Sequence, residues 1–155
     1  MSGTETDSTM FTFATDYFLL VFIASIGVLQ IAASLGRLKG LLIFKTPLVA
    51  RGLGLVLVIG AFVMFFGTGA RNLNDYQGGL DAPDQGLFFF LGGFAGIGVT
   101  FALSSLVNLR MNWERPSPEA GLDALRETNY VTALRLSLAY WLREWRTQMK
   151  SYFSG

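Results

Sequence analysis

Residues 17–35 read YFLLVFIASIGVLQIAASL, nineteen residues without one charged side chain. Two further uncharged stretches follow, GLGLVLVIGAFVMFFGTGA at residues 52–70 and LFFFLGGFAGIGVTFALSSLVNL at residues 87–109. At about 1.5 Å per helical residue, nineteen residues reach roughly 28 Å, close to the thickness of a bilayer's hydrocarbon core. None of the three stretches alternates with the period of two that a transmembrane β-strand needs. The sequence therefore predicts three transmembrane helices.

The composition supports this prediction. The chain has 155 residues, of which 52% are hydrophobic and only 15% are charged, whereas about 25% of an ordinary soluble domain is charged. A chain of this length is too short to bury three such helices in a water-soluble core. We therefore expect an all-α integral membrane protein, with three transmembrane helices and a C-terminal cytoplasmic amphipathic helix.

The distribution of charge predicts the orientation. Residues 1–16 carry a net charge of −3, residues 36–51 carry +4, residues 71–86 carry −2, and residues 110–155 carry +2. Short basic loops stay in the cytoplasm. We therefore expect a cell-membrane protein with an extracytoplasmic tail at residues 1–16 and a cytoplasmic tail at residues 110–155. The acidic start also favours an uncleaved anchor over a signal peptide, although Ala32-Ala33-Ser34 resembles a cleavage site.

The absence of cysteine and histidine excludes much chemistry. Without these residues the chain lacks thiolate ligands, cysteine nucleophiles, the usual haem and zinc ligand and the commonest general base. We expect no cofactor, no metal site and no enzyme activity. The outer loop, which holds Asp75, Asp81 and Asp84, is interpreted as a solvated turn. The polar residues after the third span are interpreted as a basic membrane anchor with a neighbouring acid. They are Arg110, Asn112, Glu114 and Arg115.

Small or hydrogen-bonding residues recur at every fourth position of the third span. They are Gly92, Gly96, Thr100, Ser104 and Asn108. Such a ridge lets a neighbouring helix approach closely. The second span offers Ala50, Gly54, Gly60 and Gly67 in the same way. We interpret the ridge as a helix-packing face, either between helices of this chain or towards another subunit.

Gln30 is the only strongly polar residue of the first span. It lies five residues before the cytoplasmic end of that span, as Ser104 does in the third span. The two residues are therefore expected at a similar depth, and Gln30 is predicted to bond to Ser104, Ser105 or Asn108. A structural role is favoured over contact with a transported substrate.

The connection at residues 36–51 holds four basic residues around the apolar run 41–44. Two interpretations stay open for this run. It lies in the membrane interface with its bases towards anionic headgroups, or the first helix continues to Phe44. Pro47 is expected in the first turn of the second helix.

The C-terminal tail predicts an amphipathic helix over about residues 128–153. Seven apolar residues at steps of three and four fall on one face. They are Val131, Leu134, Leu138, Trp141, Trp145, Met149 and Tyr152. An apolar face that carries tryptophan and is edged by bases suits the cytoplasmic surface of a membrane. The alternatives are a soluble partner or a second copy of the chain.

These patterns favour a non-catalytic small integral membrane protein that anchors or scaffolds a larger membrane assembly. Its expected partners are membrane lipid and other membrane-protein subunits or further copies of itself. The balanced charge, twelve bases against eleven acids, does not point to nucleic acid. The alternative is a small homo-oligomeric channel or transporter lined by Gln30, Ser104 and Asn108. The two functions differ in one respect: a channel needs these residues to face a water-filled axis, whereas a scaffold buries them.

Overall fold

The computed structural model describes residues 3–67, 81–109 and 122–153, and within these it is all-helical. The α-helices are α1 (Gly3–Leu35), α2 (Pro47–Gly67), α3 (Ala82–Val107) and α4 (Tyr130–Phe153), and the 3₁₀ turns are η1 (Lys39–Leu41) and η3 (Asp123–Arg126). Three of the helices are long and apolar enough to cross a membrane. The predicted fold class, three spanning helices followed by a fourth C-terminal helix, is confirmed.

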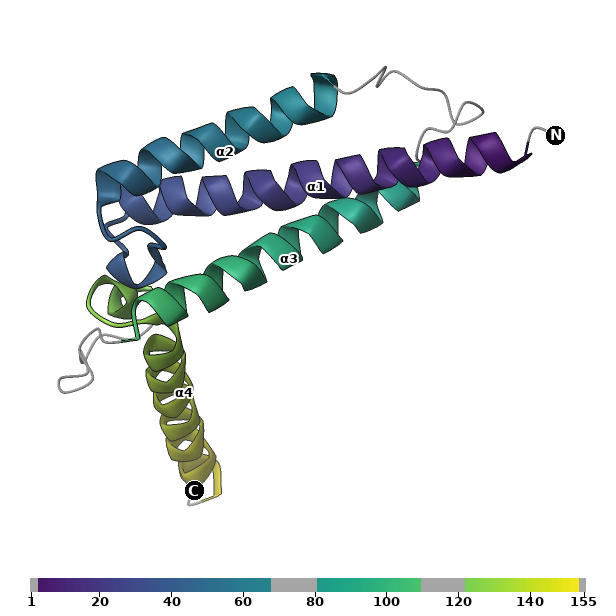
Figure 1. Ribbon diagram of the computed structural model, residues 1–155. Helices are drawn as coiled ribbons and strands as arrows, with labels where there is room; N and C mark the ends of the chain where they lie inside the picture. The colour runs from purple at the N-terminus through teal and green to yellow at the C-terminus, as the bar shows by residue number, and fades with distance from the viewer. Residues whose placement is uncertain (1–2, 68–80, 110–121, 154–155) are drawn as a thin grey trace.

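α1 is the central helix of the bundle, with α2 on one side and α3 on the other (Figure 1). Glycine allows each close approach. A Cβ atom on Gly54 would lie 2.6 Å from the carbonyl oxygen of Gly27, and one on Gly96 would lie 2.8 Å from that of Phe22. Both distances are shorter than atomic contact permits. The helices therefore touch through their backbones, as small residues allow in membrane proteins.

The outer faces of α2 and α3 carry bulky apolar side chains. Val56, Val63, Phe90 and Phe94 are all more than three-fifths exposed within the chain. Large contiguous apolar surfaces of this kind are unfavourable in water but match the hydrocarbon of a bilayer. The protein is therefore a multi-pass membrane protein.

The helices are longer than the uncharged stretches that predicted them. α1 already begins at Gly3, α2 begins at Pro47 and α3 begins at Ala82. A charged residue marks where lipid contact ends, but it does not end a helix, so each helix continues past its nearest charge. Pro47 takes the first position of α2, as expected, because a first-turn residue needs no N–H donor.

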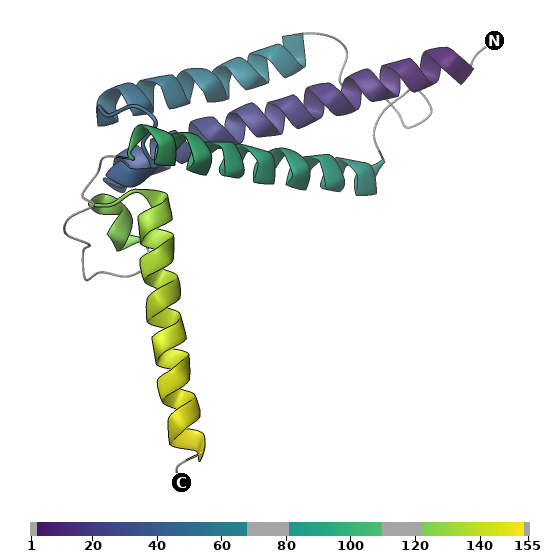
Figure 2. The same cartoon turned by 60° about the horizontal axis from the view of Figure 1, so that its bottom comes forward.

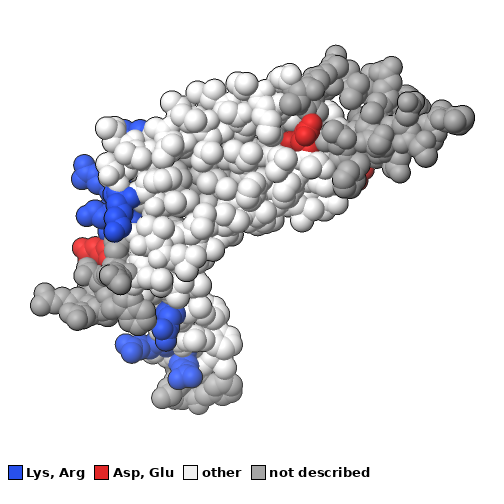
Figure 3. Space-filling view, viewed as in Figure 1, with Lys and Arg blue, Asp and Glu red and all other residues white. Residues whose placement is uncertain are grey.

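One end of the bundle is basic. α1 ends there, α2 begins there and α3 ends there, and the exposed bases Arg37, Lys39, Lys45 and Arg51 lie around these helix ends. We call it the basic end, and it forms the blue cluster beside the bundle in Figure 3. α4 leaves from this end and runs across the direction of α1–α3, which both Figure 1 and Figure 2 show.

One of the two interpretations of the run 41–44 is wrong, and its placement in the membrane interface stays a prediction. α1 ends at Leu35, and Arg37 turns the chain with a φ of 56°, so the first helix does not continue to Phe44. Leu41 and Leu42 are buried in a cluster with Ala33, Ala50, Ala124, Leu125 and Ala133. The run leaves the helical conformation because side chains from α1 and from the end of α3 bind its main chain instead.

Candidate functional site at the basic end

Gln30 binds the backbone of the connection between α1 and α2. Its Nε2 donates to the carbonyl oxygen of Leu41 at 3.2 Å, and its Oε1 accepts the N–H of Ile43 at 3.0 Å. The side chain is 1% exposed. Gln30 thus satisfies two peptide groups that would otherwise be buried without a partner.

Asn108 binds the same connection from α3. Its Nδ2 donates to the carbonyl oxygens of Leu42 at 2.8 Å and Ser104 at 2.9 Å, with a longer contact to Gly40 at 3.5 Å. The connection is therefore bound by side chains of both α1 and α3.

The predicted bond from Gln30 to Ser104, Ser105 or Asn108 is wrong. Both polar atoms of the Gln30 amide contact main chain. The connection lies between Gln30 and Asn108, and its own peptide groups need partners. The hydroxyl of Ser104 instead donates to the carbonyl oxygen of Phe101 in its own helix, at 3.2 Å. The buried Ser105 Oγ has no hydrogen-bond partner among the residues that the structure describes.

The same region holds the start of α4. Asn129 Nδ2 donates to the main-chain oxygen of Asn108 at 3.4 Å, and its Oδ1 accepts the N–H of Thr132 at 2.8 Å. Asn129 is therefore the N-cap of α4, and α4 begins at Tyr130, two residues after the predicted start. The ring of Tyr130 stacks on Phe101 of α3, with centroids 4.1 Å apart and planes at 16°.

Gly40 brings the connection against the turn before α4. A Cβ atom on Gly40 would overlap the carbonyl oxygen of Thr128 and lie 3.0 Å from that of Leu125. The connection and η3 therefore touch through their backbones. We call the contacts among Gln30, the segment 40–43, Asn108 and Asn129 the junction. It links α1, α3 and α4 at the basic end.

The predicted ridge of α3 faces α1 and the junction. All five of its residues are buried. Gly92 and Gly96 meet the backbone of α1, Thr100 donates to Gly96 at 2.8 Å, and Ser104 and Asn108 reach the junction. The ridge is thus occupied within the chain. Of the second-span residues, Ala50 and Gly54 are buried, whereas Gly60 and Gly67 have no neighbour within 4 Å of a Cβ position.

Sequence reasoning missed Gly40 and Asn129. Asn129 carried a usable signal, since asparagine just before an apolar-periodic run is a favoured N-cap. Gly40 carried none, because its role depends on a turn that arrives more than eighty residues later. Its importance follows only from the packed structure.

The stripe predicted on α4 is exposed. Trp141 is 60% and Trp145 is 53% exposed, and Leu134, Leu138 and Met149 are about half exposed. The two indole rings stack with centroids 5.9 Å apart. Val131 is exposed on the same face, and the side chain of Tyr152 lies outside the described residues.

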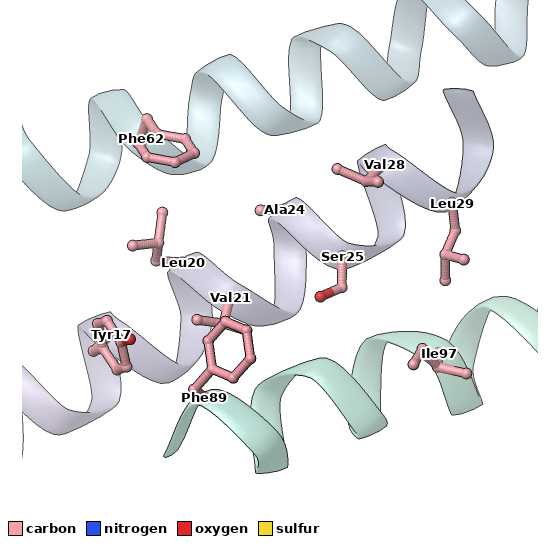
Figure 4. A pocket seen from close by; sticks show the side chains of 10 residues that line it. All are labelled: Tyr17, Leu20, Val21, Ala24, Ser25, Val28, Leu29, Phe62, Phe89 and Ile97. Atoms are coloured by element: carbon pink, nitrogen blue, oxygen red, sulfur yellow. The ribbon is translucent and has the colours of Figure 1, made fainter. Parts of the chain in front are cut away.

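A groove of about 490 Å³ runs over α1 between α2 and α3 (Figure 4). Its lining comes from α1 along Tyr17–Leu29, with Phe62 of α2 and Phe89 and Ile97 of α3 at its edges. The hydroxyls of Tyr17 and Ser25 are its only side-chain polar atoms, and it has no charge. An apolar groove of this kind suits an acyl chain or apolar side chains better than a charged solute.

The acidic residues of the described part of the chain are dispersed. Among them, no three acidic side chains come together in a way that could hold a metal ion. Asp81 and Asp84 are exposed at the start of α3, while Asp75 and the group at Arg110, Asn112, Glu114 and Arg115 lie outside the described residues. No family model matches the chain, and no curated protein or solved structure shows significant similarity to it.

Proposed function

We propose that this protein is a non-catalytic membrane subunit that anchors or scaffolds a larger membrane assembly, with its basic end in the cytoplasm. The junction carries the proposal. The strongly polar side chains Gln30, Asn108 and Asn129 bind main-chain groups and fix the start of α4. A small bundle that uses its buried polar groups to hold an external helix at one place is suited to presenting that helix.

The same burial disfavours the channel. Gln30 is 1%, Ser104 is 0% and Asn108 is 5% exposed in a single chain. Adding further copies can only bury a residue more, so these side chains cannot line a water-filled axis between copies in this conformation. A pore would need another set of polar residues, and residues 17–35, 52–70 and 87–109 include no Asp, Glu, Lys or Arg that could serve.

Other subunits need a face that the chain leaves open, and α2 offers one. Its residues 52, 56, 60, 63 and 67 follow steps of four and three along one side of the helix. A Cβ atom on Gly52, Gly60 or Gly67 would meet nothing within 4 Å. We call these five residues the outer stripe. Small residues at this spacing favour close approach of another transmembrane helix.

The test is to purify the tagged protein from its native cells in a mild detergent and to weigh the intact complexes by native mass spectrometry. The expected result is one or more foreign subunits in fixed stoichiometry. A clean homo-oligomer would overturn the scaffold and direct attention to flux measurements.

A matched pair of variants tests the outer stripe. Gly60→Leu fills an open position of the stripe, whereas Gly98→Leu fills an equally open position of α3. We expect Gly60→Leu to lose the foreign subunits and Gly98→Leu to keep them, both with the circular dichroism of the parent. Retention of all subunits by Gly60→Leu would remove the stripe from the proposal.

A further inference from the structure

α4 has no protein partner over most of its length within the described structure. Its contacts with the bundle lie at its first turn, around Asn129, Tyr130 and Ala133. Beyond them, its apolar face with Leu138, Trp141 and Trp145 is about half exposed or more. Something must cover this face in the native environment, because two stacked indoles and several aliphatic side chains are unfavourable in water.

The direction of α4 indicates what covers its apolar face. The three spanning helices define the direction through the membrane, and α4 runs across that direction in both views (Figure 1, Figure 2). A helix that leaves the end of a spanning bundle sideways runs along the membrane surface. A helix meant for a distant soluble partner has no need of this direction.

The position of α4 along α3 also supports the membrane surface as the cover of its apolar face. Tyr130 stacks on Phe101, which lies six residues before the last residue of α3. At about 1.5 Å per residue, α4 therefore starts roughly 9 Å inside the end of α3. Interfacial helices bury their apolar face about 5–10 Å into the boundary between headgroups and acyl chains. With the end of α3 at the headgroup boundary, α4 starts at that level.

The charges of α4 complete the match. Four bases and one acid lie between Tyr130 and Phe153. In Figure 3 the visible blue atoms of α4 lie on the side turned away from the spanning helices, and the side towards them is white. Basic residues beside an apolar face attract anionic lipid headgroups. Tryptophan also prefers the membrane interface.

We propose that α4 lies on the anionic lipid surface at the basic end, with Trp141 and Trp145 in the interface and its arginines among the headgroups. The junction sets the depth and direction of the helix. This inference needs the insertion of α1–α3 in a membrane but no other subunit, so it stands or falls separately from the proposed assembly.

The experiment uses the full chain with Trp113→Phe, which leaves Trp141 and Trp145 as the only tryptophans. The protein is reconstituted in nanodiscs of phosphatidylcholine and phosphatidylglycerol at about three to one. The lipids are brominated near the carbonyl end or near the methyl end of the acyl chain. We expect blue-shifted emission, strong quenching by the first lipid and weaker quenching by the second.

A control variant places the probe on the opposite face of α4. Thr147→Trp, combined with Trp113→Phe, Trp141→Phe and Trp145→Phe, leaves one indole, on the exposed polar side of α4. Its emission is expected to stay red-shifted and unquenched by either lipid. Equal quenching from both faces would overturn the flat orientation. Emission typical of water from Trp141 and Trp145 in the nanodisc would overturn the proposal and favour a soluble partner.

The anionic requirement has its own readout. In nanodiscs of phosphatidylcholine alone, we expect weaker quenching of Trp141 and Trp145. The triple variant Arg135→Gln, Arg143→Gln and Arg146→Gln should show no difference between the two lipid compositions. Shielding that appears only in nanodiscs holding two copies of the chain would show that a second copy covers the face, and would overturn the proposal.

Discussion

The side-chain amides of Gln30 and Asn108 bind the same short segment of main chain, although Gln30 lies in α1 and Asn108 caps the end of α3. Gln30 forms hydrogen bonds with the main chain of Leu41 and Ile43. Asn108 donates to the carbonyl oxygens of Leu42 and, at longer range, Gly40. The chain can therefore run from α1 to α2 while the carbonyls of Leu41 and Leu42 and the N–H of Ile43 keep hydrogen-bond partners. In lipid such satisfaction is required, because water cannot replace a missing partner.

Asn108→Leu should destabilise the bundle. It removes the donor to the buried carbonyl of Leu42, and an unpaired buried polar group costs about 1–3 kcal/mol. We expect a decrease of that size in the free energy of unfolding, measured by titration with sodium dodecyl sulfate in mixed micelles. Ser105→Ala is the control, since its buried hydroxyl has no partner to lose. Equal losses in the two variants would contradict the role given to Asn108.

Gly40→Ala should release α4 without unfolding the three spanning helices. The new Cβ overlaps the carbonyl oxygen of Thr128, and both colliding groups are backbone. Overpacking of this kind typically costs about 1–3 kcal/mol, occasionally more.

The measurement for Gly40→Ala is hydrogen–deuterium exchange over residues 122–149. Exchange there should quicken, while exchange in α1 stays at the parental rate. Gly52→Ala serves as the control because a Cβ at that position meets nothing. If exchange in α4 is unchanged by Gly40→Ala, then the contact between Gly40 and Thr128 does not hold the helix.

Replacement by alanine should change the free energy of unfolding differently at two glycines of α3. A Cβ on Gly96 would lie 2.8 Å from the Phe22 oxygen and 2.9 Å from the Ser25 Cβ, whereas one on Gly98 would meet nothing. Gly96→Ala should therefore lower the unfolding free energy by about 1–3 kcal/mol. Gly98→Ala should leave it unchanged or raise it by up to about 1 kcal/mol, because alanine favours helix. The same detergent titration distinguishes them, and a loss at Gly98 would mean that α3 packs differently.

The sequence predicted the three spanning helices because lipid leaves the backbone few options, and uncharged runs of about twenty residues are unambiguous. It also indicated a packing face on α3, and Gly92 and Gly96 of this face meet the backbone of α1. It did not predict the junction. The junction depends on the path of the main chain at residues 40–43. Because every residue has the same main-chain carbonyl group, a sequence does not indicate which of them a buried amide will bind. Gln30 was therefore recognised as a structural residue, but its partner was misassigned.

Arg37→Gly should stabilise the protein. Arg37 has a φ of 56° at the end of α1, a left-handed conformation that costs a residue with a Cβ atom roughly 1–2 kcal/mol. Glycine adopts it freely, and we expect a gain of about 1 kcal/mol, reduced by glycine's larger entropy in the unfolded chain. Arg37→Ala separates backbone from charge, since it loses the guanidinium but keeps the Cβ. A gain of the same size in Arg37→Ala would assign the effect to charge.

The proposed orientation can be tested in intact cells because the chain has no native cysteine. Thr46→Cys places a thiol at the basic end, and Asp81→Cys places one at the opposite end, just before α3. Both positions are exposed. Since short basic loops stay in the cytoplasm, a membrane-impermeant maleimide should label Asp81→Cys in intact cells and Thr46→Cys only after the membrane is opened. Labelling in the reverse order would place the basic end and α4 outside, and the anionic surface beneath α4 would then belong to the other leaflet.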